Sequence, residues 1–191
     1  MDTTNDSGLS ACNSLNLSLG YRGHLEFKSR KLTETEKIVK QLIPPQTYEC
    51  RNGFSNKHLV EKLTTYEKIE VENLLLSYLH DANDLLIGET LALLNSKKSL
   101  PLLRMRLDRS QSPSERIIWA RFINQIVGRD EEMKKVVLNE FRKVTDKYAL
   151  ISVFYDLASF NDDEIDGLIL KFVDNKEYLL AYNAKRSLQI R

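Results

Sequence analysis

Apolar residues recur three or four positions apart along most of the chain, and this spacing predicts amphipathic helices. The first helix is expected to follow Thr33, because Thr33 and Glu36 have the spacing of a capping box ahead of an apolar stripe. Pro44 and Pro45 should end that helix, since proline cannot continue one. A short helix is predicted at residues 57–63, after a turn that contains Asn52 and Gly53.

A second capping box, Thr64 with Glu67, opens a helix that is expected to run to Leu79. Residues 1–31 have a different pattern, being rich in Ser, Asn and Asp, which favours a flexible or extended lead-in. Within it, residues 21–28 alternate weakly and are typical of an extended segment. We expect residues 32–84 to form helices that pack as one domain with residues 85–191.

The second half of the chain repeats a two-helix unit. Four similar apolar segments start at Leu86, Ile117, Leu150 and Leu179, which are 31, 33 and 29 residues apart. Partner helices are predicted between them, starting at Ser99, Glu131 and Asp163. One such unit cannot bury its apolar stripe alone, so neighbours must stack. The pattern predicts an all-α fold in which residues 85–191 form a short right-handed superhelix with a curved binding groove.

Composition agrees with helices and gives no global attraction to a charged partner. The 191 residues include 42% hydrophobic and 29% charged residues but only 7 Gly and 4 Pro. A formal net charge of +1 does not favour nucleic acid or a membrane surface. No apolar stretch reaches the ~18 residues of a membrane span, and the N-terminal segment does not resemble a signal peptide. Cys12 and Cys50 suggest neither a zinc site nor a disulfide framework, so a cytoplasmic location is expected.

The last unit resembles the second helix of a HEAT-like repeat. In NKEYLLAYNAKRSLQ, which begins at Asn175, the slots of that pattern are filled by Leu179, Leu180, Ala181, Ala184, Lys185 and Leu188. The resemblance covers residues 85–191 and implies an α-solenoid of helical hairpins. It specifies architecture and no activity.

The whole chain also resembles small bacterial immunity proteins of polymorphic toxin systems. The similarity rests on LTETEKIVKQLIPP from Leu32, on GFSNKHLVEKL from Gly53 and on the run of repeats at the end. It implies a non-enzymatic protein of toxin–antitoxin or contact-dependent inhibition systems, which binds a toxin domain and covers it. Such a protein needs no cofactor and no metal.

Signatures of enzyme chemistry are absent from the sequence. It contains no P-loop, no dinucleotide fingerprint, no HExxH and no GxSxG. His24, His58 and His80 lie in three separate segments, which does not favour a metal site. The acidic run that starts at Asp162 is expected to begin a helix, where carboxylates meet the positive end of the helix dipole.

Candidate partner-binding residues lie on the second helices of the repeats. They are Arg116, Trp119, Tyr155, Asp156, Tyr182 and Lys185. Tyrosine, tryptophan and arginine dominate the energetics of protein interfaces, which favours a binding role for this surface. Trp119 has two interpretations, either an anchor flanked by Arg116 and Arg121 or a core residue between repeats.

Two other functions remain open from the sequence. One is a HEAT-like DNA-binding enzyme of the alkylpurine-glycosylase type, for which five arginines would form a phosphate-binding strip: Arg104, Arg106, Arg109, Arg116 and Arg121. The near-zero net charge argues against it. The other is a general scaffold, which the residues do not separate from an immunity protein. The sequence does not define an oligomeric state.

Overall fold

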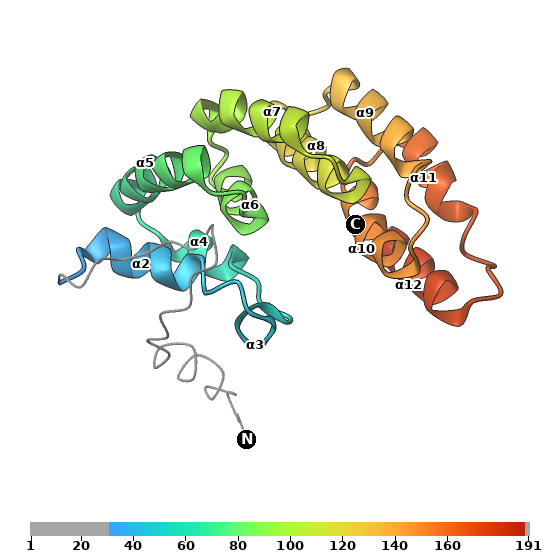
Figure 1. The fold of residues 1–191 in the computed structure, drawn as a ribbon, viewed down its shortest axis with the longest axis horizontal. Helices are drawn as coiled ribbons and strands as arrows, with labels where there is room; N and C mark the ends of the chain where they lie inside the picture. The colour runs from blue at the N-terminus through green and yellow to red at the C-terminus, as the bar shows by residue number, and fades with distance from the viewer. Residues whose placement is uncertain (1–30, 190–191) are drawn as a thin grey trace. The chain divides into compact units, whose positions relative to one another are not determined.

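A computed structural model describes residues 31–189 of the chain, and within that range the fold is all-α, as predicted. The residues divide into two compact units, one ending at Leu94 and the other beginning at Asn95. The sequence predicts one domain instead, made of residues 32–84 and 85–191. The extended segment predicted at residues 21–28 lies outside the described residues. Figure 1 shows the helices of each unit.

The first unit contains five described helices. They are α2 (Glu34–Leu42), α3 (Tyr48–Arg51), α4 (Lys57–Lys62), α5 (Thr65–Asp81) and α6 (Leu85–Leu93). Both predicted capping boxes are present, at Thr33 with Glu36 and at Thr64 with Glu67. The helix α3 was not predicted, because four residues are too few to show a helical period.

The core of the first unit forms where α5 packs against α2 and α6, and where α4 packs against α6. The fully buried residues Val39, Leu75 and Leu91 represent three of these helices. Two polar cross-links join segments far apart in sequence. The guanidinium of Arg51 donates two hydrogen bonds to the carboxylate of Asp84, at 2.7 and 2.6 Å. The second link is a 2.6 Å hydrogen bond from Asn56 Nδ2 to Thr90 Oγ1, both buried.

Cys50 corrects one expectation from the sequence. Its side chain is buried in α3, and its sulfur is disulfide-bonded rather than free. Cys12, the other cysteine of the sequence, lies outside the described residues. Because protein disulfides persist chiefly in oxidising compartments, this observation bears on the predicted location.

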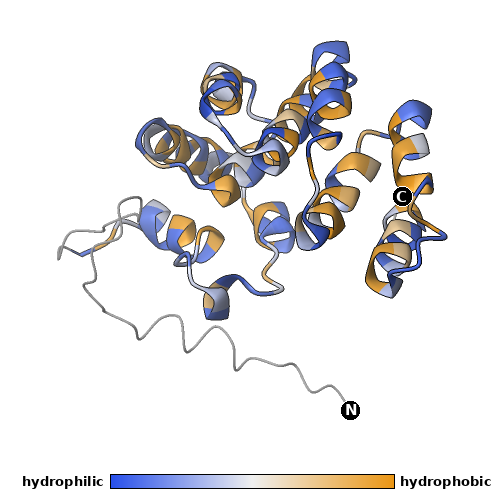
Figure 2. Cartoon of the chain, turned by 45° about the vertical axis from the view of Figure 1, so that its right-hand side comes forward, coloured by the Kyte–Doolittle hydropathy of each residue, from blue (hydrophilic) through white to orange (hydrophobic). Residues whose placement is uncertain are grey.

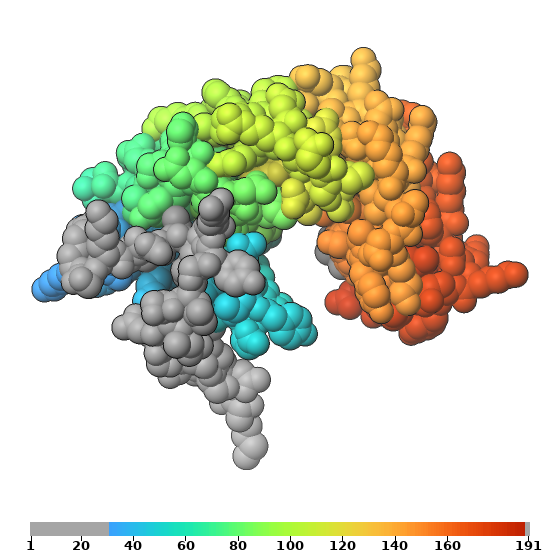
Figure 3. Space-filling model, viewed as in Figure 1, coloured from blue at the N-terminus to red at the C-terminus, as the bar shows by residue number. Residues whose placement is uncertain are grey.

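The second unit contains a short 3-10 helix and six α-helices in its described part. They are η1 (Lys97–Ser99), α7 (Leu100–Arg109), α8 (Pro113–Val127), α9 (Glu131–Phe141), α10 (Lys147–Ala158), α11 (Asp163–Leu170) and α12 (Tyr178–Gln189). In chain order, α7 packs on α8, α8 on α9, α10 on α11 and α11 on α12, and in addition α10 packs on both α8 and α12. Figure 3 shows this unit running from α7 in yellow-green to α12 in red. The predicted repeat segments at Ile117, Leu150 and Leu179 thus lie in α8, α10 and α12, of which α10 packs on both of the others.

Each helix of the second unit places its apolar stripe against its neighbours. The core includes Trp119, Phe122 and Phe154, all with at most 1% exposure, and Figure 2 shows hydrophobic stripes beside hydrophilic ones on these helices. The rings of Trp119 and Phe122 pack edge to face, with their centroids 5.6 Å apart. Phe154 also contacts Phe172, at 5.2 Å between ring centroids. Such aromatic pairs add stability beyond the area that they bury.

One polar arrangement occurs twice in this unit, and we call it the cap clamp. The N-cap of α9, Asp130, accepts hydrogen bonds from the backbone of its first turn, and Arg104 of α7 binds both Asp130 and Glu132. In the same way, Asp162 caps α11, and Lys134 of α9 binds Asp162 and Glu164. The predicted acidic helix start at Asp162 is thus confirmed.

The backbone conformation of the residue before the N-cap also recurs, at three turns of this unit. Asn95, Arg129 and Asn161 have φ angles of 54°, 50° and 50°, and each precedes an N-cap residue. Asparagine tolerates this left-handed conformation better than most residues do. Arg129 is therefore the exception among the three equivalent positions.

Candidate functional site

Four exposed tyrosines gather on the neighbouring helices α10 and α12. The exposed fractions are 68% for Tyr148, 36% for Tyr155, 71% for Tyr178 and 45% for Tyr182. Tyr148 and Tyr155 are seven residues apart, and Tyr178 and Tyr182 are four apart, so each pair lies on one side of its helix. Large exposed aromatics are unusual on a surface that contacts only water. We call these four residues the tyrosine face.

Contacts between α10 and α12 fix the positions of the two helices, and so of their tyrosines, relative to each other. The hydroxyl of Tyr155 donates a 2.8 Å hydrogen bond to Asn183 Oδ1, and Asn183 Nδ2 donates in turn to the carbonyl of Leu179. Near the first turns of the two helices, Lys147 pairs with Glu177 at 3.4 Å. The two helices therefore present their tyrosines from fixed positions.

The tyrosine rings are themselves partly ordered by their neighbours. Tyr178 and Tyr182 stack with centroids 5.9 Å apart and an interplanar angle of 24°. Arg186 Nη1 lies 3.3 Å from the Tyr182 hydroxyl and donates to it. The Nζ atom of Lys147 lies 5.0 Å from the centroid of the Tyr148 ring. Rings that are already restrained lose less conformational entropy when a partner binds.

The structure separates the six residues predicted as a binding site. Tyr155 and Tyr182 belong to the tyrosine face. Lys185 is exposed on the same helix as Tyr182 and lies 3.7 Å from Asp174. Asp156 is mostly buried in a 2.7 Å ion pair with Arg121 of α8, so it joins two repeats.

Trp119 and Arg116 support the interior of the unit. Trp119 is 0% exposed and is therefore a core residue, which corrects its interpretation as a surface anchor. Arg116 donates to the carbonyl of Leu107 at 2.6 Å and to Glu140 Oε1 at 3.0 Å. Burial raises the pKa of Glu140, but hydrogen bonds from Lys143 and Arg116 outweigh burial and hold that pKa below its ordinary value. These contacts link α7, α8 and α9.

Sequence reasoning missed Tyr148 and Tyr178, although both have an available signal. Each stands in the first turn of a helix beside a charged residue, where a core residue is not expected. The prediction instead followed aromatic and charged residues of the second helices, and of these Trp119 is buried while Tyr155 and Tyr182 are exposed.

The arginines proposed to hold DNA phosphates are largely occupied by other groups. Arg104 pairs with Asp130 and Glu132, Arg116 with Glu140, and Arg121 with Asp156, while Arg106 is buried. A guanidinium that is already neutralised by a carboxylate contributes little to the binding of a polyanion. Only Arg109 of these five is exposed without a described partner.

No group of three or more His, Cys, Asp or Glu side chains in residues 31–189 is arranged to hold a metal ion. Each helix in that range is too short or too polar to cross a bilayer.

Comparison with protein families, curated proteins and solved structures finds no match for this chain.

Proposed function

We propose that this chain is a non-enzymatic protein-binding module whose tyrosine face contacts a protein partner. The observation that carries the proposal is the set of four exposed, mutually restrained tyrosines on α10 and α12. Tyrosine supplies a large contact area with one polar group, and it is enriched where proteins bind each other. Because its rings are held before binding, the surface would associate without a large ordering cost.

We also propose that residues 85–191 form HEAT-like hairpins of a right-handed α-solenoid. Support comes from residues 95–189, where helices α8, α10 and α12 pack on each other in chain order. The cap clamps at Asp130 and Asp162 add to this support, because equivalent residues make equivalent contacts 32 positions apart. Repeated contacts between successive units are characteristic of solenoid proteins.

Charge around the tyrosine face indicates the kind of surface that would bind it. From residue 171 to 189 the chain has four basic residues, Lys171, Lys176, Lys185 and Arg186, against Asp174 and Glu177. The partner's contact surface is therefore expected to be apolar at its centre and acidic at its rim. We propose that this partner is a bacterial toxin domain and that the chain is an immunity protein, which blocks the toxin by covering it.

The experiment is coexpression of the chain with the product of the adjacent upstream reading frame, followed by purification of a stoichiometric complex. In that complex, replacing Tyr155, Tyr178 and Tyr182 together by Ala should weaken binding by about 30-fold or more, since two or more hot-spot residues are removed. The matched control is Tyr66→Ala, which removes a tyrosine of α5 that is 72% exposed and should leave affinity unchanged.

Three results would overturn the proposal. The first is a complex whose affinity is the same with and without the three tyrosines. The second is the absence of a complex together with a salt-dependent shift of duplex DNA, which would favour the DNA-binding alternative. The third is a partner with no toxic activity, which would leave a general scaffold.

The proposed location is the cytoplasm, and the disulfide at Cys50 provides its test. Alkylation of thiols in intact cells, followed by mass spectrometry of the Cys50 peptide, measures its redox state. An alkylated Cys50 would agree with a reducing cytoplasm, and a protected Cys50 would place the protein in oxidising surroundings.

A further inference from the structure

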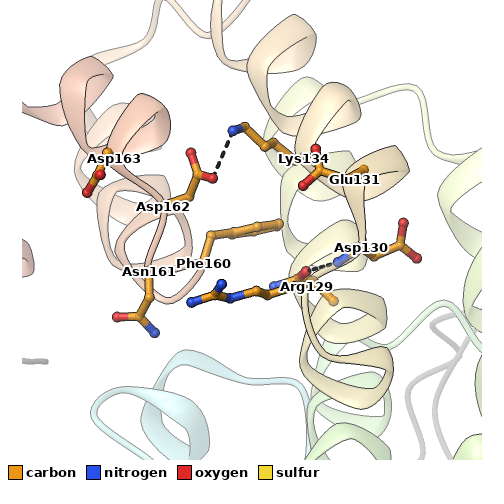
Figure 4. A pocket seen from close by; sticks show the side chains of 9 residues that line it. Arg129, Asp130, Glu131, Lys134, Phe160, Asn161, Asp162 and Asp163 are labelled. Atoms are coloured by element: carbon orange, nitrogen blue, oxygen red, sulfur yellow. Dashed lines mark hydrogen bonds and ion pairs between the residues drawn. The ribbon is translucent and has the colours of Figure 1, made fainter.

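A pocket of about 330 Å³ lies between two equivalent turns of the second unit. One turn joins α8 to α9 and contributes Arg129, Asp130 and Glu131, and the other joins α10 to α11 and contributes Asn161, Asp162 and Asp163. Figure 4 shows the ring of Phe160 in the middle of this pocket, with Lys134 and Asp162 facing each other on one side and Arg129 on the other. Phe160 is 7% exposed, so it forms a fixed apolar floor.

At the helix starts beside the pocket, the N-cap carboxylates bind backbone N–H groups of their own first turns. Asp130 accepts from the backbone N–H groups of Glu132 and Met133, and Asp162 accepts from those of Glu164 and Ile165. Both carboxylates also pair with a cation from the helix two before their own, Arg104 of α7 for Asp130 and Lys134 of α9 for Asp162. Any ligand must therefore be recognised by the remaining side chains.

Three charged side chains that line the pocket have no ion pair or hydrogen bond among the described residues. They are Arg129, Glu131 and Asp163, one positive and two negative. A simple anion would be repelled by two of them, and a simple cation by the third. A molecule with one carboxylate and two cationic groups complements all three.

Arg129 also occupies its position against the preference of the backbone. The two equivalent residues, Asn95 and Asn161, are asparagines, which tolerate a positive φ, whereas arginine at φ 50° is disfavoured. A residue in a disfavoured conformation at the edge of a cavity suggests that its side chain has a function there. Its guanidinium extends toward Asn161 along the side of the Phe160 ring (Figure 4).

We propose that this pocket binds a free basic amino acid, independently of the proposed protein partner. The guanidinium of Arg129 receives the α-carboxylate in a bidentate pair, and Glu131 and Asp163 receive the α-ammonium and the cationic side-chain terminus. The aliphatic part of the ligand lies on Phe160. The volume stands at the lower end of the range of small-molecule pockets, about 300–1,000 Å³, which suits a ligand of this size.

The test is calorimetric titration of the full chain with L-arginine and L-lysine at matched ionic strength. We expect saturable binding at one site, weakened about tenfold or more for L-argininamide, which lacks the carboxylate, and absent for L-glutamate. No saturable binding of either basic amino acid would overturn the proposal. Equal binding of L-arginine and L-argininamide would overturn it as well.

The decisive variant is Arg129→Asn, which installs the residue found at the two equivalent turns. It should melt at the same temperature as the parent chain or higher, because the backbone strain is relieved, and yet bind L-arginine about tenfold or more weakly. A second variant, Glu131→Gln with Asp163→Asn, removes the negative charges and should have a similar effect on binding. If both variants bind as the parent chain does, the pocket is not the site. Neither result depends on the tyrosine face.

Discussion

Residues 31–94 are joined by cross-links that each occur once, whereas residues 95–189 use the same cross-link twice. In the first unit, Arg51 binds Asp84 and Asn56 binds Thr90, and neither contact has an equivalent elsewhere in that unit. In the second unit, the cap clamps at Asp130 and Asp162 each join a cation to an N-cap aspartate and to the glutamate two residues after it. The difference suggests that the first unit depends on individual residues, while the second distributes its stability over equivalent contacts.

The largest expected effect is in the core of the second unit. Trp119→Ala should lower the free energy of unfolding by about 3–5 kcal/mol, because it leaves a large cavity at a fully buried position. Chemical denaturation monitored by circular dichroism measures this loss in the free energy of unfolding. Trp119→Phe is the control and should lose only about 1–2 kcal/mol, since the buried indole N–H has no acceptor among the described residues and its removal is partly favourable. A loss below about 1 kcal/mol for the Ala variant would contradict this packing.

The next effect concerns the ion pair between Arg51 and Asp84 in the first unit. Asp84→Ala removes both the N-cap of α6 and the partner of Arg51, and should cost about 2–4 kcal/mol. Trp119 is the only tryptophan, so its fluorescence reports the second unit, while circular dichroism reports both. We expect part of the unfolding transition seen by circular dichroism to move to a lower denaturant concentration. The midpoint of the transition seen by tryptophan fluorescence should not change.

The control for that experiment is Asp81→Ala, whose carboxylate is 86% exposed and pairs only with the neighbouring His80 in the described structure. It should leave both transitions in place. If the two probes shift together in the Asp84 variant, the units unfold as one, and the contrast between them fails for stability.

A smaller effect is expected at a repeated contact, and it depends on pH. A hydrogen bond from Lys134 is the main cause that holds the pKa of Asp162 below its ordinary value, and the same contact raises the pKa of Lys134 to about 12. The contribution of Asp162 is thus present above its unfolded pKa and is lost as pH falls through its lower folded pKa. The contribution of Lys134 to stability is present below its unfolded pKa and is lost as pH rises through its folded pKa of about 12.

Lys134→Met should return the pKa of Asp162 toward its ordinary value, as measured by carboxyl chemical shifts across an acid titration. Lys135→Met, one residue away and exposed, should not move it. An unchanged pKa of Asp162 in the first variant would show that the cap clamp does not form in solution.

The smallest expected effect is at the tyrosine face. Tyr155→Phe removes the hydrogen bond to Asn183 at an exposed position and should cost about 0.5–1 kcal/mol in thermal or chemical unfolding. Tyr66→Phe, in the first unit, has no described hydrogen bond to lose and should be neutral. Equal stabilities for the two variants would mean that α10 and α12 are not held in register by this contact.

Most of the helices could be predicted from the sequence, because their signals are local. The capping pair at Thr33 and the acidic start at Asp162 fix helix ends through the nearest backbone N–H groups. The period of the second unit follows from its repeated apolar segments. By contrast, α3 rests on contacts such as the one from Arg51 to Asp84, 33 residues away, which no local pattern reveals.

The candidate site was only half predictable for a related reason. Trp119 and Tyr155 both lie on second helices of the predicted repeats, but α8 packs on α7, α9 and α10, while α10 leaves one side open next to α12. Whether an aromatic residue is exposed depends on which neighbours cover it, and that is a property of the assembled unit. The pocket between the turns was missed because its two halves lie 32 positions apart.

The two cap clamps also make the second unit modular along its length. Asp130 and Asp162 start chemically matching junctions, so excision of residues 130–161 would bring Arg104 to the carboxylates of Asp162 and Glu164. Duplication of the same stretch would add one more junction of the same kind. A chain built in this way can lose or gain one hairpin and still keep the same type of contact between successive repeats.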